Sequence, residues 1–237
     1  MTNCSEKEFN PEQPHESFII AKEPYDDGNY DIALTKLGEF KSRFPYSQYA
    51  TEAELLIANS HFKLLHYAEA TASFKQFIKL HPKHPKVPYA HFKMGESYWA
   101  DAPEEVDREQ HLTSKAIDEW QVLLESYPQS PDAAKAKTLI EQGRRRIAES
   151  EMFIASFYCK KEIWHACAYR YVNLADKAPT KFKDLTRKAL LEASFAFEKL
   201  ASGLNKENAD KNLYFRKMSK TELLKQAKAL KQKANEL

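Results

Sequence analysis

A recurring pattern of small and bulky apolar positions is the strongest feature of the chain. Four times, a small residue is followed four positions later by a bulky residue, and eight positions after that by proline. Residues four apart share one face of a helix, and proline ends a helix because it lacks the N–H and clashes with the preceding turn. The pattern therefore predicts four helices of similar length. The sets are Ala33, Leu37 and Pro45; Ala70, Phe74 and Pro82; Ala116, Trp120 and Pro128; and Cys167, Tyr171 and Pro179.

A second small residue lies upstream of each set. Ala21, Ala58 and Ala155 each precede the small residue of their set by 12 positions, whereas Gly95 precedes Ala116 by 21. The third repeat has therefore gained nine residues. These intervals match the tetratricopeptide repeat, a hairpin whose two helices meet at small residues. The sequence predicts an all-α protein, a right-handed superhelical solenoid of about five such hairpins. The turns inside the hairpins are expected at Gly28-Asn29-Tyr30, Leu65-His66-Tyr67 and Glu162-Ile163-Trp164.

One proline does not fit the repeat. Pro24 occupies a position where the repeat has an aromatic residue. Because proline disfavours the α conformation in the residue before it, we expect the first helix to end or kink near Glu23. Tyr25 and Asp26 would then lie in a distorted turn.

The C-terminal half predicts longer helices and a terminal amphipathic one. Pro131 to Cys159 keeps a helical period without internal proline, and Ser130 can cap its start. A further helix is expected from Leu185 to Leu204. The tail then carries a narrow apolar stripe on a lysine-rich background, which indicates either a cap for the solenoid or a helix that docks into a partner. The stripe consists of Leu223, Ala227, Leu230, Ala234 and Leu237.

Composition argues against catalysis and against nucleic-acid binding. The 36 basic and 34 acidic residues give a net charge of +2 without a concentrated basic face. The five glycines are too scattered for a phosphate-binding loop, and no GxSxG or HExxH element occurs. His81 and His84 are flanked by prolines and fit an inter-repeat turn better than a metal site. We expect no enzymatic activity, no cofactor, no metal and no nucleic-acid partner.

The cysteines leave two interpretations open. Cys159 and Cys167 fall on opposite arms of one hairpin. They form either a disulfide in an oxidising compartment or a pair of small buried thiols.

The first helices of successive hairpins are expected to line a concave face rich in aromatic residues. Part of this apolar set must belong to the core, since helical stripes usually do. The remainder suits an extended apolar or aromatic-ended peptide. The candidate residues of this substrate-peptide groove are Phe18, Tyr25, Leu55, Asn59, Phe62, Tyr89, Phe92 and Trp99.

Several segments together resemble one family of repeat proteins, the BamD-type outer-membrane assembly lipoproteins. The resemblance covers roughly Ser17 to Pro179, and its most specific element is the Asp-Arg-x-Gln insertion of the third repeat. The segments are 44–50, 80–89, 107–110, 127–130, 151–158 and 164–171.

The resemblance implies a function. Members of the family are lipid-anchored on the periplasmic face of the outer membrane and belong to the machine that folds β-barrel proteins into it. Cys4 would match the lipid-carrying cysteine, although Asn3 replaces the usual small residue and no signal peptide precedes it here. Arg170, six residues after Trp164, would contact the POTRA region of the barrel insertase. The partners implied are this insertase, unfolded outer-membrane proteins and accessory lipoproteins.

The same resemblance suggests how the chain divides. Residues 1–13 would form a flexible linker and anchor, residues 14–130 the substrate-facing repeats 1–3, and residues 131–237 the insertase-facing repeats 4–5 with a capping helix. Two rival functions stay open. One is a periplasmic repeat adaptor that coordinates cell-wall or envelope proteins, which has no reason to carry the insertion at 107–110. The other is an enzyme subunit or regulator that presents a substrate, which the lack of a second domain disfavours.

Overall fold

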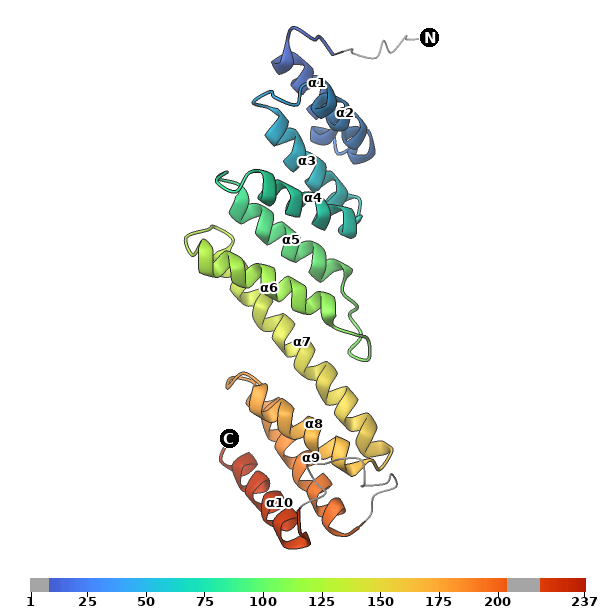
Figure 1. Cartoon of the computed structure of the whole chain (residues 1–237), viewed down its shortest axis with the longest axis vertical. Coiled ribbons are helices and arrows are strands. Elements are labelled where there is room, and N and C mark those ends of the chain that lie inside the picture. Colours follow the sequence, from blue (N-terminus) through green and yellow to red (C-terminus); the bar gives the residue numbers. More distant parts are fainter. Residues whose placement is uncertain (1–8, 204–217) are drawn as a thin grey trace. The chain divides into compact units, whose positions relative to one another are not determined.

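The computed structural model describes residues 9–203 and 218–237, and within this part of the chain it contains ten α-helices and no strand (Figure 1). Consecutive helices pack sequentially as antiparallel hairpins, which confirms the predicted all-helical repeat fold. The helices are α1 (Pro14–Asp26), α2 (Tyr30–Arg43), α3 (Ala50–Lys63), α4 (Tyr67–Leu80), α5 (Val87–Asp101), α6 (His111–Ser126), α7 (Ala133–Lys160), α8 (Trp164–Lys177), α9 (Lys183–Ala201) and α10 (Lys220–Asn235).

The chain divides into two compact units. The first unit comprises residues 1–102 and 111–143, and the second comprises residues 103–110 and 144–237. The functional division expected after residue 130 stays a prediction, whereas the boundary between the two compact units lies inside α7, after Gly143. The reason is the length of α7, which has 28 residues against 14 in α8. Its first part lies against α6, where a Cβ atom on Gly143 would come within 2.9 Å of Ile117, and its second part packs in the second unit.

The small and bulky positions of the repeat are buried as predicted. Ala33, Ala70, Ala116 and Cys167 have no solvent-exposed surface, and neither do Leu37, Phe74 and Trp120. Tyr171 is also buried. The upstream small residues Ala21, Ala58 and Ala155 are equally inaccessible. Because two helices approach closely only where side chains are small, these positions confirm the register of the hairpins.

The three predicted turns share one conformation. Their first residues, Gly28, Leu65 and Glu162, have φ values of +80°, +62° and +59°. In each turn the next N–H donates to a carbonyl oxygen five residues earlier, as from Asn29 to Pro24 at 2.8 Å. This is the Schellman arrangement that satisfies the last carbonyl groups of a helix. It needs a left-handed residue, which glycine adopts without strain and the other two do not.

The prediction for Pro24 was wrong, because α1 continues through it to Asp26. The missing N–H of Pro24 removes a single hydrogen bond of the helix. The last turn is still closed by the Asp27 N–H, which donates to the Glu23 carbonyl oxygen at 3.0 Å. The Pro24 carbonyl oxygen accepts the Schellman bond from Asn29. Pro24 therefore ends up in the last turn of a normally capped helix.

The chain is packed onto the first hairpin well before α1 begins. Phe9 is buried, and its ring meets Phe40 edge-on at 6.3 Å. The Arg43 guanidinium lies 5.5 Å from the Phe9 ring centroid, and the Ser17 hydroxyl donates to the Asn10 carbonyl oxygen at 3.0 Å. Phe9 and Asn10, which fall within the linker expected over residues 1–13, are therefore packed against the first hairpin.

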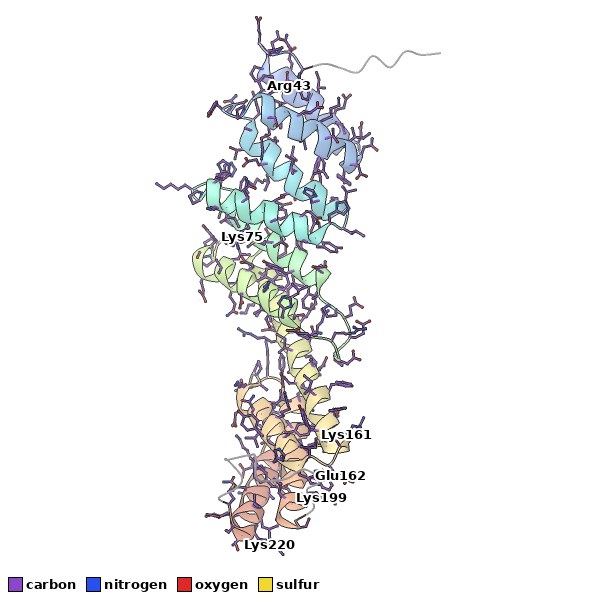
Figure 2. All side chains as sticks on the ribbon, turned by 45° about the vertical axis from the view of Figure 1, so that its right-hand side comes forward. Arg43, Lys75, Lys161, Glu162, Lys199 and Lys220 are labelled. Carbon is purple, nitrogen blue, oxygen red and sulfur yellow. A yellow bond between two sulfur atoms is a disulfide. The ribbon has the colours of Figure 1, made fainter. Side chains whose placement is uncertain are left out.

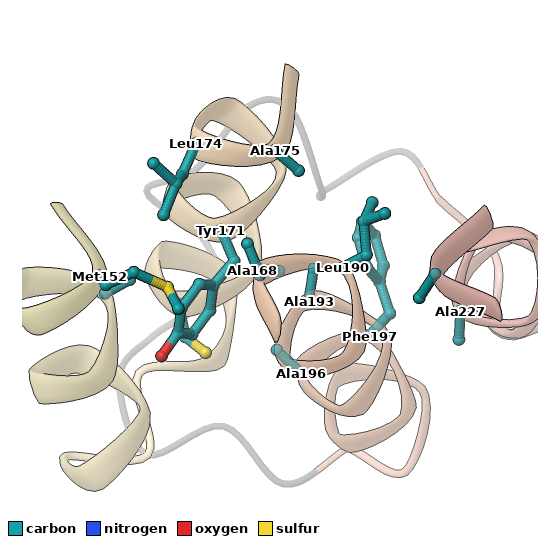
Figure 3. Packing of buried hydrophobic residues seen from close by; sticks show 14 of the residues in the cluster. Met152, Ala168, Tyr171, Leu174, Ala175, Leu190, Ala193, Ala196, Phe197 and Ala227 are labelled. Atoms are coloured by element: carbon teal, nitrogen blue, oxygen red, sulfur yellow. The ribbon is translucent and has the colours of Figure 1, made fainter. Parts of the chain in front are cut away.

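The second unit has a core built by α7 to α10 (Figure 3). The long helix predicted from Pro131 begins at Ala133, after a turn in which the Ser130 hydroxyl accepts from the Asp132 N–H at 3.3 Å. The helix predicted to reach Leu204 is α9; it is described to Ala201, and Leu204 lies outside the described residues.

Helix α10 covers α9, as expected for a cap. Leu223, Ala227 and Ala234 are buried, and the Ser194 hydroxyl donates to the Ala227 carbonyl oxygen at 2.8 Å. Ser219 and Glu222 form a capping box at its start. The predicted apolar stripe thus faces the chain's own core from Leu223 to Ala234, whereas Leu237 is exposed.

Candidate functional site: two protein-binding surfaces

Helices α1, α3 and α5 carry the residues predicted for the substrate-peptide groove, and half of them are buried. Phe18, Leu55, Asn59 and Phe92 belong to the interior of the first unit. The Phe18 ring, for example, stacks on Tyr49 with centroids 5.2 Å apart. The other four keep part of their surface exposed: Tyr25, Phe62, Tyr89 and Trp99.

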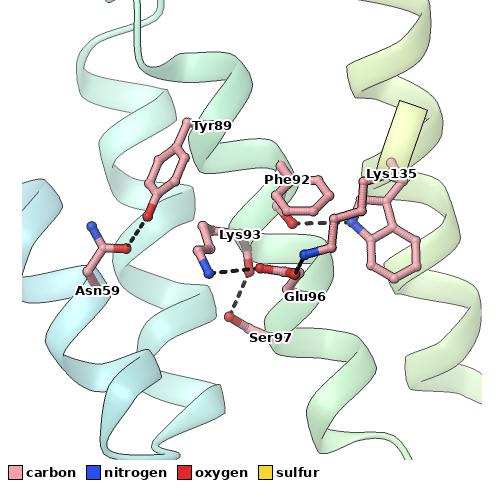
Figure 4. Close-up of polar contacts among 8 residues, drawn as sticks. Asn59, Tyr89, Phe92, Lys93, Glu96, Ser97 and Lys135 are labelled. Carbon is pink, nitrogen blue, oxygen red and sulfur yellow. Dashed lines mark hydrogen bonds and ion pairs between the residues drawn. The ribbon is translucent and has the colours of Figure 1, made fainter. Parts of the chain in front are cut away.

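A polar network lies among these aromatic residues (Figure 4). The Tyr89 hydroxyl donates to Asn59 Oδ1 at 2.7 Å, so the Asn59 amide oxygen already has a partner inside the chain. Burial, and secondarily the nearby Tyr25, raises the pKa of Tyr89 to about 12. Tyr89 therefore stays neutral and serves as a hydrogen-bonding aromatic side chain.

Two lysines on this face were missed by the sequence prediction. Lys93 and Lys135 donate to the two carboxylate oxygens of Glu96 at 2.8 and 2.7 Å. Their ammonium groups also lie 4.2 Å from the Phe62 centroid and 4.9 Å from the Phe92 centroid, respectively. Lys93 could have been found from its spacing of three residues before Glu96. Lys135 could not, because it comes from α7.

The three charges give the face a net positive centre beside aromatic rings. Burial would raise the pKa of Glu96, but the hydrogen bonds from Lys135 and Lys93 outweigh it, and the net pKa lies below its ordinary value. One carboxylate is thus shared by two ammonium groups. Since the Lys135 side chain is largely exposed, the centre can accept a further carboxylate.

Arg170, the predicted insertase contact, is only partly exposed and already has partners within the chain. Its Nη1 atom donates to Glu151 Oε2 at 3.2 Å, and its guanidinium carbon lies 5.1 Å from the Tyr158 ring centroid. Both contacts come from α7, so they hold the guanidinium of this α8 residue against α7. Trp164, the other predicted contact, is buried and meets Phe195 edge-on at 5.7 Å. Arg170 is therefore accessible to a partner, whereas Trp164 belongs to the interior of the second unit.

A pocket lies beside Arg170 on the same pair of helices. It has a volume of about 560 Å³. Its lining combines an apolar part with the charged side chains of Arg144, Glu151 and Lys177, which suits a protein partner better than a small apolar ligand. The apolar lining includes Ile147, Leu174 and Pro179.

The inserted segment of the third repeat is organised by its glutamine. The Gln110 side chain is buried, and its Nε2 atom donates to the carbonyl oxygens of Pro103, Glu105 and Arg108 at 3.3, 3.0 and 3.3 Å. One amide thus closes the whole loop on itself. This gives a physical reason for glutamine at the end of the Asp-Arg-x-Gln insertion.

The described residues offer no metal site and no membrane span. None of their His, Cys, Asp and Glu side chains form a group of three or more that could hold a metal ion. His81 instead pairs with Glu54 at 2.8 Å, as part of an inter-repeat turn. In the same part of the chain, every helix is too short or too polar to cross a bilayer. Cys4, the predicted lipid anchor, lies outside the described residues.

The fold and these surfaces define a helical repeat protein that presents binding surfaces to other proteins. Residues 11–227 match the family described as YfiO, outer membrane lipoprotein. Because this match covers most of the chain, the protein belongs to that family, whose members are non-enzymatic assembly factors.

Curated relatives of this chain share one name. A Vibrio cholerae protein is 25% identical over 196 residues, which cover 79% of this chain and 80% of the relative. A Pasteurella multocida protein is 26% identical over 212 residues, or 84% and 80% of the two chains. A Caulobacter vibrioides protein is 28% identical over 182 residues, or 77% of this chain and 58% of the relative. Each is named outer membrane protein assembly factor BamD.

Proposed function

We propose that this chain is a scaffold subunit of the machine that assembles β-barrel proteins in the outer membrane. The observation that carries the proposal is the family match over residues 11–227, which spans both compact units. In this proposal the second unit binds the POTRA region of the barrel insertase, and the first unit receives nascent outer-membrane proteins. Accessory lipoproteins are further partners of the same scaffold.

The insertase contact centres on Arg170. Its guanidinium is held by Glu151 and Tyr158 but keeps about a third of its side-chain surface exposed. A planar guanidinium has five N–H donors, so it can keep Glu151 and still offer a two-point contact to a carboxylate of the insertase. The neighbouring pocket, with Arg144 and Lys177 in its lining, extends the contact beyond one ion pair.

The substrate contact uses the exposed part of the first unit's groove. Tyr25, Phe62, Tyr89 and Trp99 supply aromatic surface, and Lys135 supplies positive charge. The C-terminal strand of a β-barrel protein alternates apolar and polar residues and ends in an aromatic residue and a carboxylate. The aromatic side chains suit the first feature, and the positive centre around Glu96 suits the second.

Anchoring to the periplasmic face of the outer membrane is assigned to acyl chains on Cys4. Stable attachment of a soluble domain needs more than one acyl chain. Expressed with a lipoprotein leader, the protein should fractionate with outer membranes. Cys4→Ala should release it to the periplasm, while Ser5→Ala should leave it bound. If the Cys4→Ala protein stays membrane-bound, the anchor lies elsewhere.

Affinity purification from envelopes tests the scaffold function. A tagged chain should co-purify the barrel insertase, and depletion of the chain should reduce the folded, heat-modifiable fraction of outer-membrane barrel proteins. A photo-crosslinkable peptide with a barrel protein's C-terminal sequence should label residues before Gly143. Recovery of cell-wall proteins without the insertase would instead support the envelope-adaptor alternative.

A further inference from the structure

Helices α7 and α9 expose four large apolar side chains in the second unit. On α7, Phe153 is 43% and Phe157 49% exposed; on α9, Leu191 is 38% and Phe195 45% exposed. Each pair is spaced four residues apart, so the two members lie on the same face of their helix. Each helix therefore presents a short apolar strip, and a contiguous exposed apolar surface can mark an interaction site.

A groove of about 520 Å³ lies between these two helices. Met152 and Leu185, both buried, form its apolar floor together with Tyr171, and Phe153 lines one wall. Cys159, whose disulfide to Cys167 ties α7 to α8, also lines the groove. We call this the α7–α9 groove. Its lining thus combines a fixed apolar floor with an exposed aromatic side chain.

Four lysines lie in or beside the α7–α9 groove. Lys160 and Lys188 line it directly. Lys161 lies 5.7 Å from the Phe157 ring centroid, and Lys199 lies 5.0 Å from that of Phe195, so the exposed rings carry ammonium groups over their faces.

Figure 2 marks Lys161 and Lys199 near the turn between α7 and α8. Lys199 also lies 6.0 Å from the ring of Trp164, the first residue of α8. This end of the α7–α9 groove therefore places positive charge beside exposed aromatic surface.

The lining of the α7–α9 groove also holds two glutamates, Glu149 and Glu192. Glu149 pairs with Arg145 at 2.9 Å, and this arginine also pairs with Asp184 at 2.7 Å. The positive charge offered to a partner therefore comes from the lysines beside the exposed rings and from the excess of basic residues in this half of the chain. Over residues 144–237 the chain has 21 lysines and arginines against 11 aspartates and glutamates. Over residues 1–143 the balance is reversed, with 15 against 23. The small net charge of the whole chain therefore hides a strongly basic second half.

We infer that the α7–α9 groove binds an acidic segment of a partner protein that carries bulky apolar side chains between its carboxylates. The apolar side chains would pack against Phe153 and the groove floor, where aromatic anchors contribute most of the binding energy. The carboxylates would meet the lysines in and beside the groove, which attract an acidic partner and exclude a basic one. The site is distinct from the surfaces of the proposed function, since Arg170 and its partner Glu151 are not among the residues that line this groove.

The test uses the full chain and a fluorescein-labelled 14-residue peptide in which leucine and phenylalanine alternate with glutamate. Anisotropy should show saturable binding that weakens as salt is added. The same peptide with lysine in place of glutamate should not bind. The double variants Phe153→Ser/Phe157→Ser and Lys160→Glu/Lys188→Glu should each bind the acidic peptide at least about tenfold more weakly.

Matched control variants in the first unit exclude a general effect of surface charge or apolarity. Ile32→Ser/Leu80→Ser removes two equally exposed apolar side chains, and Lys75→Glu/Lys79→Glu reverses two exposed lysines of α4. Both controls should bind the acidic peptide as the unaltered chain does. Equal loss in the controls, equal binding of the lysine peptide, or unchanged binding by both groove variants would overturn the inference.

Sedimentation of the chain alone tests the remaining alternative, in which a second copy of this chain occupies the α7–α9 groove. The inference expects a monomer at micromolar concentration, with or without Phe153→Ser/Phe157→Ser. A dimer of the unaltered chain that this double variant dissociates would overturn the inference and assign the groove to self-association.

Discussion

The indole ring of Trp120 lies directly against the backbone of Gly95. Trp120 is fully buried, and its Nε1 atom donates to the Phe92 carbonyl oxygen at 3.2 Å. A Cβ atom on Gly95 would lie 2.7 Å from the Trp120 Cδ1 atom and closer still to Nε1. By contrast, a Cβ atom on Gly38 in α2 would have no neighbour within 4 Å. The two glycines therefore sit in helices for different reasons.

This contrast predicts opposite effects of alanine at the two positions. Gly95→Ala should destabilise the first unit by about 1–3 kcal/mol, because the rigid indole cannot yield without losing its hydrogen bond. Gly38→Ala should stabilise it by about 0.5–1 kcal/mol, since alanine is the better helix former and nothing obstructs it. Urea unfolding followed by circular dichroism measures both. A stabilising Gly95→Ala would show that the third hairpin is less tightly packed than described.

The sequence was sufficient for the hairpins because each repeat constrains several positions at once. Each repeat requires a small residue at the helix crossing, a bulky residue one turn later and a proline at the helix end. Few other folds require this combination. Gly95 was placed correctly by this reasoning alone, although the additional nine residues separate it from Ala116. The hydrogen bond from Trp120 was not foreseen, since periodicity predicts burial and says nothing about the partner of a buried N–H.

Contacts between residues that are distant in the sequence could not be predicted from it. Lys135 reaches Glu96 from 39 residues away, and Arg170 reaches Glu151 across a hairpin. No local pattern connects such pairs. The burial of Phe18 and Phe92 was also not resolved, because a helical stripe alone does not separate the core from the rim of a groove. Pro24 shows the opposite error. The rule that proline ends a helix was applied there, although the last turn of α1 tolerates the loss of one hydrogen bond.

The Cys159–Cys167 disulfide answers the alternative that the sequence left open, and it can be checked by alkylation. The Cα atoms are 5.1 Å apart and the residues are separated by eight positions. Without reductant, the unfolded chain should take up iodoacetamide only at Cys4; after reduction, all three cysteines should react. A loop this short limits the entropy that the bond removes from the unfolded chain, so Cys159→Ala/Cys167→Ala should cost about 2 kcal/mol. Three reactive thiols before reduction would show that the pair is unbonded.

The Glu96 carboxylate predicts a loss of stability in acid. Its pKa is lowered in the folded protein, so its contribution is complete above the ordinary value of 4.5 and is lost as pH falls through the folded value. Urea unfolding of the first unit at a series of pH values from neutral downwards should therefore show a smaller decline for Glu96→Gln than for the unaltered chain. Lys135→Met should also flatten the decline, because it removes one of the two hydrogen bonds. Parallel pH curves for all three proteins would contradict the assignment.

Substitution of Arg170 should affect insertase binding much more than it affects the stability of the chain. Its ion pair with Glu151 is about one-third exposed on the arginine side and somewhat more on the glutamate side. Such pairs contribute little, so Arg170→Glu should lower the stability of the isolated chain by no more than about 1 kcal/mol. If the guanidinium is buried against an insertase carboxylate, the same change places like charges opposite each other and should weaken insertase binding by about 2–5 kcal/mol.

The experiment for Arg170 uses a second arginine of the same unit as a control. It then uses an insertase whose opposing carboxylate has been reversed as a rescue. Calorimetric titration of the insertase's POTRA region should show the loss for Arg170→Glu but not for Arg187→Glu, an exposed arginine of α9. Unfolding curves of both variants should stay close to that of the unaltered chain. Reversing the opposing carboxylate of the insertase to lysine should restore binding to Arg170→Glu, because the pair is then rebuilt with opposite polarity. Equal binding by the two arginine variants would mean that Arg170 serves only the hairpin, through Glu151 and Tyr158, and that the insertase is held elsewhere.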